Sequence, residues 1–172
     1  TIFMYISELD TPALTVDLDI LERNIAQMAA LCQNLDIPLR PHTKTHKVPQ
    51  IAQMQIEAGA QGITCQKVGE AEVMVAVGID DILIPYNIVG KPKLERLMQL
   101  TKQATITVAV DSDITARGLS EQAQKDGATI QVVVEMDTGS KRCGVQSPQE
   151  VQALAQTIVD LPCLDFQGVM TY

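Results

Sequence analysis

A unit that repeats along the chain constrains the fold more than any other feature of the sequence. Each copy holds a stretch with helical spacing of apolar residues, a glycine that can end the helix, and a short run rich in β-branched residues. The two clearest copies predict helices over 49–58 and 68–77, followed by strands at 62–65 and 81–84. Strands that alternate with helices need crossover connections, so the pattern predicts an α/β fold with a parallel sheet.

Helix caps, apolar spacing and β-branched runs place the remaining elements in the same order. Helices are expected over 19–34 with a capping box at Asp19, from Pro92 onward, from an N-cap at Asp113 to Gly127, and over 148–159 behind an N-cap at Ser147. Strands are expected at 37–42, 105–110, 130–135 and 164–170. The spacing of about 20–25 residues per unit is that of a (β/α)8 TIM barrel, which takes about 250 residues in all.

Residues 18–172 are therefore expected to form the N-terminal part of such a barrel, about six of its eight βα units. A doubly wound open sheet is the alternative, but the Gly-x-Gly-x-x-Gly turn that often marks it is absent from the sequence. A barrel that lacks two strands has open edges and an uncovered apolar interior. We therefore expect this chain to be the N-terminal portion of a longer protein.

Composition and charge narrow the function classes. The chain is 46% hydrophobic and 20% charged, which is typical of a globular protein and not of a disordered one. The net charge of −8 argues against a nucleic-acid or anionic-membrane surface and favours a small-molecule ligand. Because the sequence has neither a long apolar run nor a signal peptide, we expect a cytoplasmic protein whose four widely spaced cysteines are reduced.

The densest polar cluster is Arg40-Pro-His-Thr-Lys-Thr-His-Lys47, at the predicted end of the first barrel strand. Barrel enzymes place their chemistry at the carboxyl ends of the strands. Lys44 lies among an arginine, two histidines and a second lysine, and positive neighbours disfavour its protonated form. It is therefore a candidate Schiff-base nucleophile, and a solvated basic loop is the alternative. The His42-x-x-x-His46 spacing suits a metal only on a helix, which Pro41 disfavours, so no metal ligand is assigned.

A second polar cluster, Glu135-Met-Asp-Thr-Gly-Ser-Lys-Arg-Cys-Gly144, follows a Val-Val-Val strand, again at a carboxyl end. Its Asp-Thr-Gly sequence can form a tight turn. Arg142 can offer a fixed, permanently charged donor fork to an anionic oxygen. The cluster is therefore a candidate cofactor clamp, and the alternative is a common turn followed by a surface arginine.

Both clusters belong to a set of five segments that carry a wider resemblance. The segments are Asp10-Thr-Pro-Ala-Leu-Thr-Val-Asp-Leu-Asp19, Arg40-Pro-His-Thr-Lys-Thr-His-Lys47, Ile63-Thr-Cys-Gln-Lys-Val-Gly-Glu-Ala-Glu72, Val108-Ala-Val-Asp-Ser112 and Val134-Glu-Met-Asp-Thr-Gly-Ser-Lys-Arg-Cys-Gly-Val145. Together they resemble the D-threonine aldolase and D-serine dehydratase family. The resemblance implies an alanine-racemase-like fold, in which a pyridoxal-phosphate-binding barrel is followed by a β-domain that also takes in the first strand of the chain.

On this resemblance, residues 1–17 would be a strand segment of the β-domain, with the strand itself at 5–17, and 18–172 the incomplete barrel. The resemblance also implies site residues: Lys44 would hold pyridoxal 5'-phosphate covalently, His42 and His46 would be its neighbours, Arg142 would approach the cofactor ring oxygen, Tyr172 would lie beside the ring, and Gln66 would be a weaker contact. A divalent metal, manganese or zinc, is expected in the longer protein, with ligands that are not in this chain.

The activity that the resemblance implies is that of a lyase on D-3-hydroxy amino acids, which either cleaves the Cα–Cβ bond or eliminates the β-hydroxyl. An amino-acid racemase of the same fold, a non-catalytic pyridoxal-phosphate-binding protein and a cofactor-free barrel aldolase are the alternatives. The expected partners are a small D-amino acid and a second copy of the longer protein in a homodimer, with no nucleic acid and no membrane. No turnover is expected from this chain alone.

Overall fold

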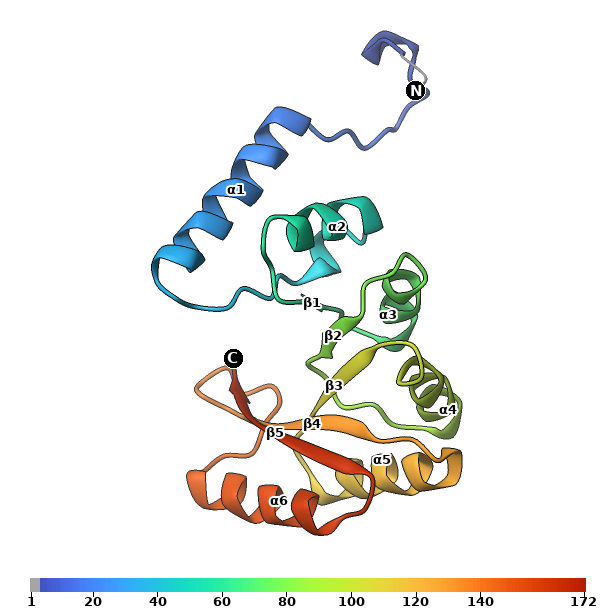
Figure 1. Cartoon of the computed structure of the whole chain (residues 1–172), viewed down its shortest axis with the longest axis vertical. Coiled ribbons are helices and arrows are strands. Elements are labelled where there is room, and N and C mark those ends of the chain that lie inside the picture. The colour runs from blue at the N-terminus through green and yellow to red at the C-terminus, as the bar shows by residue number, and fades with distance from the viewer. Residues whose placement is uncertain (1–3) are drawn as a thin grey trace.

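The computed structural model describes residues 4–172, which fold around a five-stranded parallel sheet with the strands in the order β1-β2-β3-β4-β5 (Figure 1). The strands are β1 (Ile63–Thr64), β2 (Asp81–Ile84), β3 (Thr105–Val110), β4 (Ile130–Met136) and β5 (Leu164–Thr171). The helices are α1 (Leu18–Asn34), α2 (Pro49–Glu57), α3 (Val68–Val75), α4 (Lys91–Leu100), α5 (Asp113–Asp126) and α6 (Pro148–Asp160), with short 3-10 turns η1 (Ile6–Glu8) and η2 (Thr43–Thr45).

The strand order decides between the two architectures that the sequence allows. Each strand pairs with the one that follows it in the chain, and α3 to α6 lie along the outer side of the curved sheet (Figure 1). A doubly wound sheet reverses its strand order at a switch point and carries helices on both faces, whereas a barrel does neither. The chain is therefore the incomplete α/β barrel that the repeat predicts.

The core lies between the sheet and its helices. Every second residue of a strand points to the same face, and the register pairs Ile82 with Ile106 and Val108 with Val132 on the helix side. These side chains are at most 2% exposed. Fully buried helix residues pack on them, among them Leu97, Met98, Leu119 and Ile158. Each such side chain contributes about 1.5–3 kcal/mol of hydrophobic stabilisation, which is what holds the helices on the sheet.

The prediction of a strand at 37–42 is wrong, because the segment does not form a full strand. The segment runs beside β1, where Thr64 donates its backbone N–H to the carbonyl of Pro41 at 2.8 Å, but only a single parallel bridge, His42 with Thr64, is formed. Pro38 and Pro41 have no N–H and cannot donate to a strand ladder. The sheet therefore has five strands within residues 4–172 instead of six.

The N-terminal segment has no strand partner within the described residues. Residues 5–17 contain η1 and otherwise run extended without a strand partner among residues 4–172, and Leu14 is 99% exposed. A strand needs a neighbour to satisfy its backbone groups, and no element of the described chain lies beside this one. Residues 1–3 lie outside the described part, and the assignment of 1–17 to a β-domain stays a prediction.

Two helix caps differ from the expected ones by a few residues. Asp17, not Asp19, caps α1 by accepting the backbone N–H of Ile20 at 3.0 Å. Ser112, not Asp113, caps α5. The expected Ser147 cap of α6 is confirmed, because its hydroxyl accepts the Glu150 N–H at 3.2 Å. In each case a short polar side chain just before the first turn is in reach of the free amides.

Candidate active site

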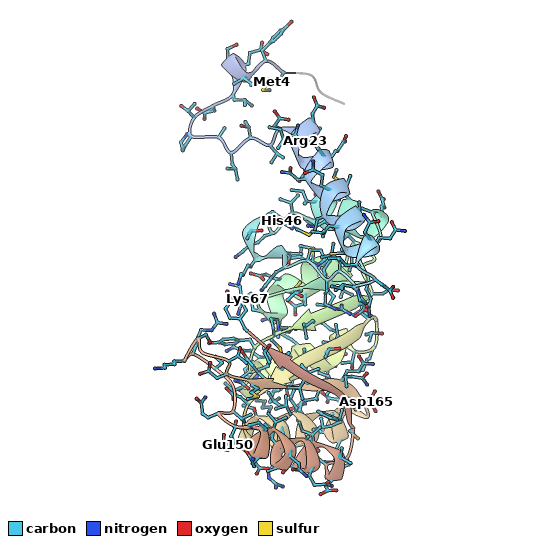
Figure 2. The ribbon with its side chains drawn as sticks, turned by 90° about the vertical axis from the view of Figure 1, so that its left-hand side faces the viewer. Met4, Arg23, His46, Lys67, Glu150 and Asp165 are labelled. Atoms are coloured by element: carbon cyan, nitrogen blue, oxygen red, sulfur yellow. The ribbon has the colours of Figure 1, made fainter. Side chains whose placement is uncertain are left out.

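The predicted site residues lie at the carboxyl ends of the parallel strands: Gln66 follows β1, Arg142 follows β4, Tyr172 follows β5, and Lys44 follows His42, which forms a bridge with Thr64 at the end of β1. Figure 2 shows His46 and Lys67 on one side of the molecule and Asp165, at the start of β5, on the opposite side. The turn η2 and the loop after β4 both lie on the side that carries His46 and Lys67. This is the edge at which barrel enzymes place their active sites.

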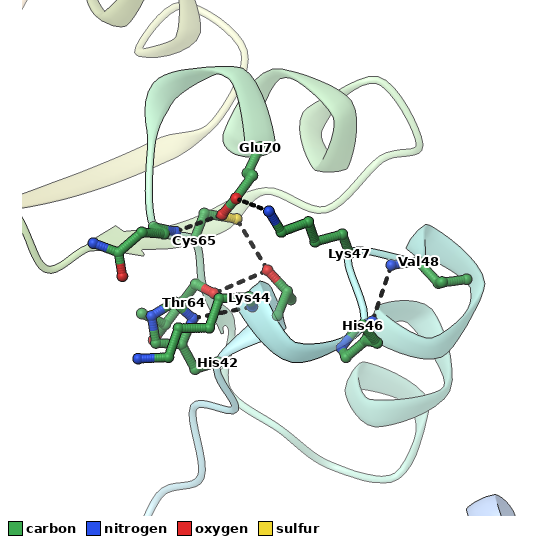
Figure 3. Close-up of polar contacts among 10 residues, drawn as sticks. His42, Lys44, His46, Lys47, Val48, Thr64, Cys65 and Glu70 are labelled. Atoms are coloured by element: carbon green, nitrogen blue, oxygen red, sulfur yellow. Dashed lines mark hydrogen bonds and ion pairs between the residues drawn. The ribbon is translucent and has the colours of Figure 1, made fainter. Parts of the chain in front are cut away.

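Lys44 lies on η2, and the residue before it anchors the turn (Figure 3). Thr43 is fully buried; its hydroxyl donates to the Thr64 carbonyl at 3.1 Å and contacts the Cys65 Sγ at 3.6 Å. The His42 Nδ1 accepts the Lys44 backbone N–H at 3.3 Å and so caps the turn. The backbone of Lys44 is therefore held through the two residues before it, while its side chain stays exposed.

Two of the positive charges expected around Lys44 are neutralised. The Arg40 guanidinium forms two hydrogen bonds with the Asp81 carboxylate, at 2.8 and 2.9 Å, and the Lys47 Nζ lies 3.1 Å from the Glu70 Oε1. A paired charge has little field left to act on a third group. Arg40 and Lys47 thus each lie in an ion pair, and the role of Lys44 as a Schiff-base nucleophile stays a prediction.

Both histidines of the cluster are held in the neutral form. Burial, and then the nearby Lys44 charge, lower the pKa of His42, and burial lowers the pKa of His46. The Nδ1 of His46 accepts the Val48 N–H at 3.0 Å, as the Nδ1 of His42 does from Lys44. A neutral ring that accepts at Nδ1 carries its proton on Nε2, and both Nε2 atoms are buried without a hydrogen-bond partner within residues 4–172.

Gln66 and Glu70 continue this half of the site. Gln66 lies beside the His42 ring, and its backbone N–H donates to the Glu70 Oε2 at 2.8 Å. Glu70 was not singled out from the sequence. A signal for it exists, since Gln66-x-x-x-Glu70 recurs as Gln146-x-x-x-Glu150, where the same backbone-to-carboxylate bond is 2.8 Å.

The loop after β4 supplies the second half of the site. The Arg142 guanidinium lies over the Tyr172 ring, 5.0 Å from its centroid, a cation–π contact. The Thr138 hydroxyl donates to the Tyr172 carbonyl at 3.2 Å. The Asp137 Oδ1 accepts the backbone N–H groups of Gly139 and Lys141, which form the expected tight turn and lower the pKa of Asp137. Arg142 and Tyr172, which are distant in the sequence, are thereby placed together.

Two carboxyl groups beside this loop, those of Glu135 and Asp111, were not identified in the sequence analysis. Glu135 is 4% exposed, and burial, followed by the nearby Asp111, raises its pKa, while Arg142 opposes the shift. The Asp111 Oδ2 accepts the Gly144 N–H at 3.1 Å and so ties the loop to the end of β3. Glu135 directly follows Val-Val-Val, a run that is typical of a buried strand. Charged side chains are rare at such positions, so a glutamate there could have indicated a buried acid.

The described residues carry neither a metal cluster nor a membrane span. Within residues 4–172, no three His, Cys, Asp or Glu side chains lie close enough to hold a metal ion. No helix of this part of the chain is both long and apolar enough to cross a bilayer.

The Cys65 thiol is buried, which raises its pKa to about 11, so it is no nucleophile at neutral pH.

Comparison with known families gives this arrangement a context. The family described as alanine racemase, N-terminal domain, matches residues 16–172. The chain belongs to this family. Two relatives are a D-threonine aldolase from Arthrobacter sp, 45% identical over 167 residues, and a 3-hydroxy-D-aspartate aldolase from Paracoccus denitrificans, 39% identical over 168 residues. They match 97% and 96% of this chain but only 44% and 43% of their own lengths.

Two solved structures agree with the fold. The D-threonine aldolase from Filomicrobium marinum superimposes with a TM-score of 0.93 at 44% identity, over 95% of this chain and 44% of that one. The D-threo-3-hydroxyaspartate dehydratase from Delftia sp. HT23 gives a TM-score of 0.85 at 35% identity, with the same coverage. The chain thus spans less than half the length of these relatives, and the resemblance drawn from the sequence segments is confirmed.

Proposed function

We propose that the protein containing this chain is a pyridoxal-phosphate-dependent lyase that acts on D-3-hydroxy amino acids. The observation that carries the proposal is the exposed Lys44 amine on an anchored turn at the carboxyl edge of a barrel sheet. Relatives at 37–45% identity add the substrate class, since they are two aldolases and a dehydratase of D-3-hydroxy amino acids. Lys44 is the group that we assign to hold the cofactor.

The residues present fit the ring of pyridoxal phosphate. The His42 Nε2 is a buried hydrogen-bond donor without a partner among residues 4–172, which an acceptor atom of a ligand would satisfy. Arg142 offers a charged donor to a ring oxygen, and the Tyr172 ring offers an apolar face. When bound, the cofactor supplies an electron sink for the bonds at the substrate Cα.

The chain's own residues would do the positioning and the proton transfer. Lys44, held through Thr43 and the His42 cap, presents its amine at the edge of the sheet and would carry a proton to or from the substrate Cα. Arg142 would keep its donor fork fixed against the Tyr172 ring. The neutral His42 would donate from Nε2 without adding charge beside the amine.

Two outcomes are open to a D-3-hydroxy amino acid. Cleavage of the Cα–Cβ bond turns D-threonine into glycine and acetaldehyde. Loss of the β-hydroxyl as water, followed by uptake of water at the resulting imine, gives a keto acid and ammonia. A manganese or zinc ion on the hydroxyl, expected from elsewhere in the longer protein, would assist either route.

A racemase is the second candidate, because an alanine racemase from Desulfosudis oleivorans is 29% identical over 171 residues. It would exchange the Cα proton of the substrate without breaking a carbon–carbon bond. A non-catalytic pyridoxal-phosphate-binding protein would show the cofactor without turnover. A homodimer in the cytoplasm is the assembly and location that we expect for the lyase.

The proposal is tested on the full-length protein loaded with pyridoxal phosphate and manganese. Product analysis with D-threonine and D-3-hydroxyaspartate should give glycine and an aldehyde, or a keto acid and ammonia. Lys44→Ala should abolish both the activity and the cofactor adduct that borohydride fixes, whereas Lys67→Ala, an exposed lysine on the same side, should change neither. A pyridoxyl group mapped to Lys47 or Lys67 would overturn the assignment, and conversion of D- to L-alanine alone would favour the racemase.

A further inference from the structure

An ion pair joins the turn that carries Lys44 to the first turn of α3, with a buried Glu70 carboxylate and a Lys47 side chain that is 56% exposed (Figure 3). The Lys47 Nζ lies 3.1 Å from the Glu70 Oε1, and the other carboxylate oxygen accepts the Gln66 N–H at 2.8 Å. Glu70 is 8% exposed. Burial opposes its ionisation, but the Gln66 amide and Lys47 outweigh burial and hold the pKa of Glu70 below its ordinary value. The carboxylate is therefore charged and fully engaged.

The backbone of Lys47 belongs to the same turn as Lys44. Its N–H donates to the Thr43 carbonyl at 2.8 Å, and the His46 N–H donates to the same oxygen at 3.1 Å. Lys47 has φ +55°, a left-handed conformation that is unfavourable for a residue with a side chain. The turn thus ends on a strained residue whose side chain is tied to a different element.

An internal comparison shows that the ion pair does more than cap α3. Glu150 accepts the Gln146 N–H at the start of α6 in the same way as Glu70 accepts that of Gln66, at the same 2.8 Å. Glu150 is exposed and forms no ion pair within residues 4–172. The backbone-to-carboxylate bond therefore forms at a helix start without burial or a lysine, although α6 also has the Ser147 cap and α3 has no side-chain cap; the link to Lys47 is an added contact to the lysine-bearing turn.

We propose that Glu70, through Lys47, is a positioning residue that holds the Lys44 turn in one conformation. The turn is then fixed at two points, by Thr43 to the end of β1 and by Lys47 to α3, with Lys44 between them. The catalytic consequence of this inference rests on the proposed function, because it assumes that Lys44 holds the cofactor. A lysine that acts on both cofactor and substrate must return to the same place in every turnover, and fixed geometry favours that.

The test uses the full-length protein with Glu70→Gln, Lys47→Met and the conservative Lys47→Arg. Glutamine keeps an oxygen for the Gln66 N–H but removes the charge. We expect Glu70→Gln and Lys47→Met each to lower kcat at least tenfold with little change in KM or cofactor content, and the double variant to be no worse than either single one. Lys47→Arg should retain most of the activity. Glu150→Gln, the matched cap, should leave kcat unchanged.

A second measurement does not depend on activity. Amide hydrogen exchange of His46 and Lys47, whose N–H groups close the turn, should be faster in Glu70→Gln and unchanged in Glu150→Gln. Unchanged exchange in Glu70→Gln, or faster exchange with unaltered kcat, would overturn the inference. If the wild-type protein has no lyase activity, the proposed function fails, and the exchange result still decides whether the ion pair holds the turn.

Discussion

At the scale of single residues, Lys44 and Arg142 are placed by contrasting means. Lys44 is fixed through its backbone, by the buried Thr43 and the His42 cap, and its side chain is left exposed. Arg142 is fixed through its side chain, which lies over the Tyr172 ring. A group that must move during a reaction benefits from the first arrangement, and a group that supplies a constant charge benefits from the second.

Arg142→Gln in the full-length protein tests this difference. Under the proposed function, the change would remove a charge-assisted hydrogen bond to the cofactor ring oxygen and leave the covalent link at Lys44, so we expect kcat to fall about tenfold or more with only a small loss of cofactor affinity. Steady-state kinetics and cofactor titration measure the two effects. Equal losses of both would indicate that the arginine is structural, and unchanged kinetics that it plays no part in the site.

At the scale of elements, the loop between β4 and α6 depends on one glycine. Gly144 has φ +102°, and a Cβ there would lie 2.6 Å from the Asp137 nitrogen and 2.8 Å from the Met136 carbonyl carbon. Both contacts are with backbone atoms, which cannot turn away as a side chain can. The glycine therefore allows the loop to return to β4, where Val145 pairs with Glu135 and Asp137.

Gly144→Ala should consequently destabilise the folded protein by about 2–3 kcal/mol, the sum of backbone strain and the clash. Gly127→Ala is the matched control, since Gly127 has φ +61° with nothing within 4 Å of the added Cβ. It should cost only about 1 kcal/mol. Urea unfolding of the full-length variants measures both. Equal losses at the two positions would show that the loop can move to relieve the clash.

At the scale of the whole molecule, the described residues form a sheet that is open on one side. None of the α1 residues is buried, and a groove of about 510 Å³ lies between α1 and α2, lined by apolar side chains such as Leu21, Ile25 and Met28. Leu14 and Ile6 are 99% and 81% exposed. Apolar surface of this extent is uncommon on a monomeric protein.

The 172-residue chain by itself should therefore bind a hydrophobic dye strongly and unfold without a sharp transition. Dye fluorescence and thermal melting followed by circular dichroism measure the two effects, with the full-length protein as the control. A soluble monomer that melts cooperatively and leaves the dye dark would contradict this expectation. It would mean that the open sheet and α1 are stable without any further covering.

The sequence by itself determined the elements whose signals are local. Strands 81–84 and 105–110 were predicted with their observed bounds, and the Ser147 cap was found, because alternation and capping depend on neighbours in the chain. Lys44 was found as a candidate because its cluster follows a strand end. The resemblance, not the spacing, supplied the pairing of Arg142 with the site.

Only the tertiary structure decided what depends on residues far apart in the sequence. The ion pairs of Lys47 with Glu70 and of Arg40 with Asp81 each join charged groups on different elements, which the sequence does not show to be neighbours. The segment 37–42 does not form the predicted strand, because a ladder of hydrogen bonds needs N–H donors that its prolines lack. Charge neutralisation and strand pairing are properties of neighbours in space, and a linear sequence does not say which residues those neighbours are.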